Sequence, residues 1–98
     1  MVEGRIMKIN SIFIVYDGDT SGIGSNLPDG HFYVMIEYET PLLWVFNRVK
    51  NFTCDTFSTY YKAKKLADSM KELSSFKNVP IIEGYLDRNT GEIVEKKL

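Results

Sequence analysis

The sequence predicts an α+β fold: a mostly antiparallel five-stranded sheet with one helix packed on one face, in the order β-β-β-α-β-β. Three observations lead to this prediction. One long stretch, residues 56–76, has the period of an amphipathic helix. Stretches rich in β-branched and aromatic residues surround it, three before it and two after it. Short turn signals separate most of these stretches, so we expect hairpins and antiparallel pairing to dominate.

Length and composition limit the possible architectures. The 98 residues predict a single domain over 1–98, in which residues 1–8 form a loosely ordered lead-in. A hydrophobic content of 44% is enough for a core, and a net charge of -1 gives no general attraction to nucleic acid or membrane. The chain therefore reads as a soluble globular domain rather than a disordered or strongly basic one.

Three further features indicate a cytoplasmic location. Cys54 is the only cysteine, so no internal disulfide can form, which suits a reducing compartment. The longest apolar run, residues 12–16, is far too short to span a bilayer. The N-terminal residues lack the apolar segment and cleavage site of a signal peptide. We accordingly expect no membrane association.

The predicted helix has a clear apolar stripe. At 100° per residue, one arc holds Tyr60, Ala63, Leu66, Ala67, Met70 and Leu73. Lysines and acidic residues occupy the rest of the circumference. Candidate N-caps are Asp55, Thr56 and Ser58, and the helix should end before Pro80. One amphipathic helix can cover only one face of the sheet.

The strands are expected at residues 9–16, 31–40, 42–51, 79–86 and 92–97. Residues 17–30 carry four glycines, a proline and three aspartates, which predicts a long turn-rich loop. Residues 87–91 predict a tight turn in which Gly91 takes a left-handed conformation.

The second strand alternates, with Phe32, Val34, Ile36 and Tyr38 on one side. If the next turn lies at Thr40–Pro41, the other side pairs Tyr33 with Arg48, Met35 with Phe46, and Glu37 with Trp44. This register predicts a partner-binding patch made of Tyr33, Met35, Glu37, Trp44, Phe46, Arg48 and Lys50. Aromatic residues, Met and Arg are typical of protein interfaces. The competing interpretation is that the first strand, the 17–30 loop or the C-terminal hairpin covers this side.

The loop after the first strand contains the sharpest motif. Asp17-Gly-Asp19-Thr-Ser21-Gly matches the first half of an EF-hand calcium loop, in which alternate oxygens converge on a cation. Pro28 stands where that loop needs a glutamate, and the preceding segment is a strand rather than a helix. A looser calcium or magnesium site at Asp17, Asp19 and Ser21 remains a hypothesis, and otherwise we expect no cofactor.

Two resemblances start from the same residues. IFIVYDGD, with Ser21 at the position of that family's threonine, resembles the nucleophile motif of haloacid-dehalogenase-type phosphatases, which implies a metal-dependent hydrolase. The likeness covers this motif alone, and the chain lacks the alternating strand-helix pattern of that fold. A strand ending in Tyr16-Asp17 before a polar turn is also similar to small CRISPR-associated nuclease-like proteins, which have a helix where this chain has its glycine loop.

Residues YKAKKLADSMKEL and VPIIEGYL are similar to a pattern common in small proteins of phages and mobile elements, which implies no activity. Our first hypothesis is a non-enzymatic protein-binding or regulatory module that acts through the aromatic and charged sheet face, with a homodimer as one form of it. The second is a single-stranded nucleic-acid binder that uses the same face and the basic helix. The third is the metal-dependent hydrolase or calcium loop at Asp17 and Asp19.

Overall fold

The computed structural model describes residues 8–18, 30–43 and 46–98, which form five strands, one α-helix and a short 3₁₀ helix. Their bounds are β1 Lys8–Gly18, β2 Gly30–Leu43, β3 Phe46–Phe57, α1 Tyr60–Met70, a 3₁₀ helix Ser74–Phe76, β4 Ile81–Asp87 and β5 Glu92–Glu95. The predicted α+β fold and its element order are confirmed. None of the helices in these ranges is long and apolar enough to cross a membrane.

The strands form one mixed sheet in the order β3-β2-β1-β4-β5. The neighbours β1 and β2, β2 and β3, and β4 and β5 pair antiparallel, as three hairpins would predict. The central strands β1 and β4 pair parallel, from Ile12 opposite Ile81 to Tyr16 opposite Tyr85. The sheet is therefore mostly antiparallel with one parallel pair at its centre.

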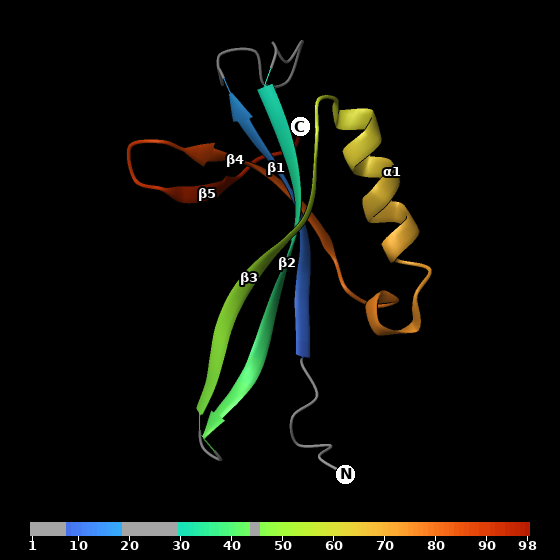
Figure 1. Cartoon of the computed structure of the whole chain (residues 1–98), viewed down its shortest axis with the longest axis vertical. Coiled ribbons are helices and arrows are strands. Elements are labelled where there is room, and N and C mark those ends of the chain that lie inside the picture. Colours follow the sequence, from blue (N-terminus) through green and yellow to red (C-terminus); the bar gives the residue numbers. More distant parts are fainter. Residues whose placement is uncertain (1–7, 19–29, 44–45) are drawn as a thin grey trace.

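That parallel pair explains the position of the helix. Because β3 runs in the same direction as β1, the chain must cross the sheet to enter β4 in parallel, and parallel strands need such a crossover. Helix α1 makes this crossover and packs against β1, β2 and β3. Figure 1 shows α1 and the short 3₁₀ helix after it on one side of the sheet, while the β2–β3 ribbon runs down and away from α1.

The core lies between α1 and the side of the sheet that faces it. Even-numbered residues of β1 and β2 supply most of it, in keeping with the two-residue period of a strand. The buried members are Ile12, Ile14, Tyr16, Phe32, Val34, Ile36, Ala63, Ala67, Met70 and Val79. Small residues at Ala63 and Ala67 let the helix approach the sheet closely, since both side chains are fully buried. The prediction that Phe32, Val34, Ile36 and Tyr38 share one side of the second strand is thus confirmed.

The helix starts later than the sequence suggests. Thr59 is the N-cap, and its hydroxyl accepts a 3.3 Å hydrogen bond from the backbone N–H of Lys62. The expected start near residue 56 and its candidate caps were wrong because β3 continues to Phe57, where β2 supplies pairing partners. The helix also ends at Met70, so Leu73 lies beyond it and is exposed rather than part of the buried stripe.

The register of the β2–β3 hairpin also differs from the prediction. Leu43 lies opposite Phe46, so the chain reverses between these two residues and not at Thr40–Pro41. Pro41 is part of β2. It lies beyond Glu39, which forms the last described pair with β1, opposite Lys8, and it also lies next to a register irregularity between β2 and β3. Both settings tolerate a residue that cannot donate a backbone hydrogen bond.

Candidate functional site

The side of the sheet opposite α1 carries a row of apolar side chains, which we call the helix-free face. Cross-strand partners share a face, so Phe13 lies beside Met35 on one flank and Ile82 on the other. Val15 lies in the same way between Tyr33 and Gly84. The apolar members that concern us are Phe13, Val15, Tyr33, Met35, Ile82 and Leu86.

These side chains shield one another only in part. Val15, at the centre, is 2% exposed, while Phe13, Tyr33, Met35 and Ile82 are all half-buried. The sequence offered three covers, and two of them, the first strand and the C-terminal hairpin, are themselves strands of the sheet and so cannot cover it. Most of the third, the 17–30 loop, lies outside the described residues. Within residues 8–18, 30–43 and 46–98, no helix or strand lies across this face.

The structure brings together three of the residues predicted for the partner-binding patch. Tyr33, Met35 and Glu37 follow one another on the helix-free face of β2. Lys50 pairs with Tyr38, which packs against the core, so Lys50 lies on the helix-bearing side instead. The predicted register was wrong: Met35 pairs with Thr53 rather than Phe46, and Tyr33 pairs with Thr56 rather than Arg48.

The remaining patch residues lie at the far end of the β2–β3 hairpin or outside the described chain. Phe46 pairs with Leu43 and Arg48 with Thr40, so neither stands opposite Met35 or Tyr33. Trp44 falls outside the described residues. Sequence reasoning missed Phe13, Val15, Ile82 and Leu86 because β1 and β4 are apolar on both sides, which hides the alternation that made β2 readable.

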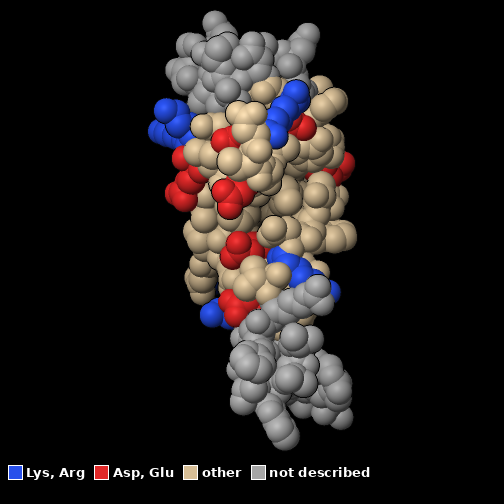
Figure 2. Space-filling view, turned by 90° about the vertical axis from the view of Figure 1, so that its left-hand side faces the viewer, with Lys and Arg blue, Asp and Glu red and all other residues tan. Residues whose placement is uncertain are grey.

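Two acidic residues of β2, Glu37 and Glu39, continue the line of Tyr33 and Met35 on the helix-free face. Glu37 accepts a 3.1 Å hydrogen bond from the Nδ2 of Asn10, which fixes its carboxylate beside Ser11. Glu39 continues the same side of β2. Figure 2 views the side opposite the helix: its middle is mostly uncharged, acidic groups are scattered over it, and basic groups lie above and below. The middle of this side is therefore mostly uncharged, and both acidic and basic groups lie around it.

Of the predicted metal ligands, only Asp17 is among the described residues. It lies near the end of β1. Its Oδ1 accepts a 3.0 Å hydrogen bond from Nε of Arg88 and lies 2.8 Å from Nη2 of the same guanidinium. A guanidinium therefore stands where a cation would bind. Asp19 and Ser21 lie outside the described residues. Among the residues that the structure describes, no group of three or more His, Cys, Asp or Glu side chains could hold a metal ion.

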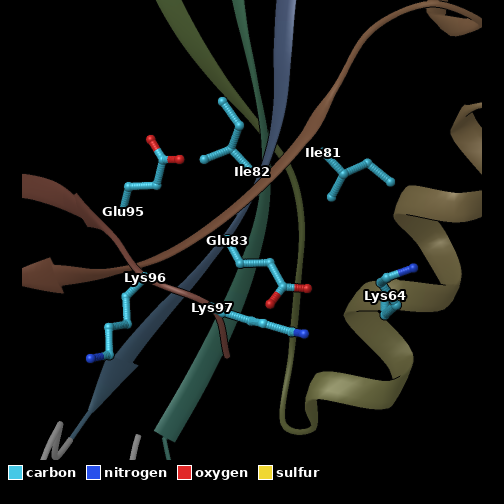
Figure 3. Close-up of a pocket in the computed structure, with 7 residues that line it drawn as sticks. All are labelled: Lys64, Ile81, Ile82, Glu83, Glu95, Lys96 and Lys97. Atoms are coloured by element: carbon cyan, nitrogen blue, oxygen red, sulfur yellow. The ribbon is translucent and has the colours of Figure 1, made fainter. Parts of the chain in front are cut away.

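A pocket lies between β4, the C-terminal residues and α1. It has a volume of about 440 Å³, and its lining includes Ile81, Glu83 and Lys97. Glu83 is the centre of a clasp: one oxygen accepts a 2.8 Å hydrogen bond from the backbone N–H of Leu98, and the other accepts one from the hydroxyl of Tyr60. Figure 3 shows the Glu83 carboxylate pointing toward α1. This clasp joins the helix and the chain end to the sheet.

Two groups have shifted acidities. Burial, and then the hydrogen bond to Glu83, raise the pKa of Tyr60 to about 12, so the phenol stays protonated and donates. Cys54 is exposed, and partial desolvation and then the nearby charge of Asp55 raise the pKa of its thiol. A reactive cysteine needs the opposite shift, so Cys54 is a poor nucleophile where it stands.

Comparisons with protein-family models, curated proteins and solved structures gave no match to this chain. Its function must therefore be argued from its own geometry. The helix-free face is a half-buried apolar surface across which no described helix or strand lies.

Proposed function

We propose that the protein is a small, non-enzymatic protein-binding module that holds a partner protein on its helix-free face. The observation that supports this is the half-buried row of Phe13, Tyr33, Met35 and Ile82 around the nearly buried Val15, with no described helix or strand across it. A contiguous apolar surface rimmed by polar groups is typical of a protein-interaction site. Tyr, Phe and Met are also the residue types that interfaces favour.

The rigid support of this face strengthens the proposal. Phe13 and Val15 stand on β1, the central strand, whose other side is the core of the molecule. Side chains anchored in this way lose little conformational freedom on binding, because the strands already fix their backbone. A partner that covers the row would remove apolar area from water, at about 25 cal/mol per Å² of area.

The single-stranded nucleic-acid alternative fits the geometry less well. The helix lysines Lys62 and Lys65 are exposed on α1, across the sheet from Tyr33 and Met35. One strand of nucleic acid cannot use the aromatic face and the helix lysines at once. The nearby Glu37 and Glu39 would also repel its phosphates.

The proposal is tested by capture with matched surface variants. The wild-type protein, a Met35→Glu variant and a Lys65→Glu control are immobilised, and host proteins retained by each are quantified by mass spectrometry. Lys65 is exposed on α1, on the other side of the sheet, so its variant controls for added negative charge. We expect a partner retained by wild type and control but lost with Met35→Glu, and a purified partner should bind with a negative heat-capacity change.

Circular dichroism of the three proteins shows that each variant is folded. Retention of the same proteins by wild type and Met35→Glu would contradict the proposal. So would a partner that is lost equally with the Lys65→Glu control.

A further inference from the structure

Strand β3 forms one edge of the sheet and is unusually open. It is 12 residues long, and every residue from Val49 to Asp55 is exposed. Two of its apolar side chains, Val49 and Phe52, are each 57% exposed. An open edge presents unpaired backbone donors and acceptors, which are a template for another strand.

The opposite edge is protected. Strand β5 has only four residues, and Lys96 and Lys97 follow it directly. Short edge strands and lysines both discourage edge pairing. The two edges therefore differ in how readily they accept another strand. Pairing through β3 would join two copies, and no further copies would add to the sheet because β5 is not an open edge.

We propose that a second copy of this chain pairs with β3 across a two-fold axis, with the two β3 strands antiparallel. An isologous contact of this kind needs residues that complement one another on the same strand. Lys50 and Asp55 meet this need. Lys50 pairs with Tyr38 and Asp55 pairs with Val34 in the β2–β3 ladder, so both lie on the helix-bearing side.

A register irregularity puts Asp55 on that side. Thr53 pairs with Met35 and Asp55 with Val34, which leaves Cys54 as an extra residue in β3. Without this bulge, Asp55 would have the parity of Thr53 and would face the other way. Bulges near sheet edges re-aim side chains in this manner.

Charge selects the register of the pair. With the axis at Phe52, the two Phe52 side chains face each other, and Lys50 of each copy lies opposite Cys54 and beside Asp55 of the other copy. The Asp55 carboxylate accepts a hydrogen bond from its neighbour Thr56 through one oxygen, which leaves the second oxygen for Lys50. With the axis at Lys50, the two ammonium groups would oppose each other.

This pairing goes beyond the proposed function and does not depend on it. It joins two five-stranded sheets edge to edge, so the two helix-free faces come to lie side by side rather than against each other. The surface available to a partner is then doubled.

Sedimentation velocity over a range of concentrations tests the pairing. We expect wild type to dimerise, and Lys50→Glu or Asp55→Lys alone to weaken dimerisation about tenfold, since two attractive cross-strand pairs become repulsive. The double variant Lys50→Glu/Asp55→Lys should regain the wild-type affinity. The exposed Lys65→Glu on α1 makes the same charge change as Lys50→Glu and should leave dimerisation unchanged.

Hydrogen exchange gives a second, local measurement. Amides of β3 should gain protection as concentration rises, while those of β5 should not. A protein that stays monomeric, single variants that match wild type, or a double variant that stays weak would each overturn the pairing. Loss of the dimer with Met35→Glu instead would place the contact on the helix-free face and overturn it as well.

Discussion

The hydroxyl of Tyr60, at the first turn of α1, donates a hydrogen bond to the carboxylate of Glu83 in β4. The other oxygen of this carboxylate accepts the backbone N–H of Leu98, whose side chain packs against the core. One half-buried acid thus connects the helix, the inner part of the sheet and the chain end. A glutamate in an apolar strand would otherwise be costly to desolvate.

The first prediction concerns this contact. Tyr60→Phe removes the donor and leaves Glu83 with one partner fewer, so the free energy of unfolding should fall by about 1–3 kcal/mol. Glu83→Gln keeps a carbonyl oxygen that can accept from the Leu98 N–H, and its amide N–H can donate to the Tyr60 hydroxyl, so it should cost less. Urea denaturation of both single variants and the double variant measures the coupling, and additive effects of the two substitutions would contradict a direct interaction.

The pH dependence of stability follows from the same contact. The pKa of Tyr60 is raised from an ordinary value of 10.0 to about 12 in the folded protein, so folding favours the protonated phenol. Its stabilising contribution is complete below pH 10.0 and is lost as the pH rises toward about 12. Denaturant midpoints of wild type should therefore fall over this interval relative to those of Tyr60→Phe, which lacks the titrating group. Parallel pH curves for the two proteins would contradict the shift.

The elements that sequence could predict are those with local, redundant signals. Alternation in β2 assigned Phe32 and Val34 to the core and Tyr33 and Met35 to the other side, as the structure confirms. The turn at residues 87–91 was also predicted correctly. Gly91 has a positive φ of 74°, and its N–H donates a hydrogen bond to the carbonyl of Asp87 at 2.7 Å. Neither inference needs knowledge of distant contacts.

The hairpin register and the clasp could not be predicted, because both depend on contacts between residues that are distant in the sequence. Thr40–Pro41 carries a generic turn signal, yet the sheet absorbs Pro41 within β2. Similarly, Glu83 looks like an ordinary polar break in VPIIEGYL, and its role depends on Tyr60 and Leu98, which are distant in the sequence. Three of the seven predicted patch residues, Phe46, Arg48 and Lys50, lie away from their predicted partners because one wrong turn moves every cross-strand neighbour.

The two sides of the sheet should respond differently to truncation. Ile14 is fully buried in the core under α1, so Ile14→Ala should lower the free energy of unfolding by about 2–5 kcal/mol. Met35 is half-buried on the helix-free face, so Met35→Ala should lower it by less than about 1.5 kcal/mol while weakening partner binding. Chemical denaturation measures both variants. Equal losses of stability would mean that a second core layer covers the helix-free face.

The last prediction concerns the close approach of β4 and β5 at Gly84. A Cβ at this position would lie 2.4 Å from the carbonyl oxygen of Val94, and backbone cannot give way as a flexible side chain would. Gly84→Ala should therefore push β5 outward and lower the free energy of unfolding by about 1–3 kcal/mol.

Hydrogen exchange locates the effect of this substitution, because the amides that β5 uses to pair with β4 should lose protection before those of β1 and β2 do. The matched control is Gly91→Asn in the turn of the same hairpin. A Cβ there meets nothing within 4 Å, and asparagine tolerates the left-handed conformation that φ of 74° requires, so this variant should stay close to wild type. A Gly84→Ala protein as stable as the Gly91→Asn control would show that the Val94 carbonyl leaves room for a Cβ at position 84, which contradicts the close approach of the two strands.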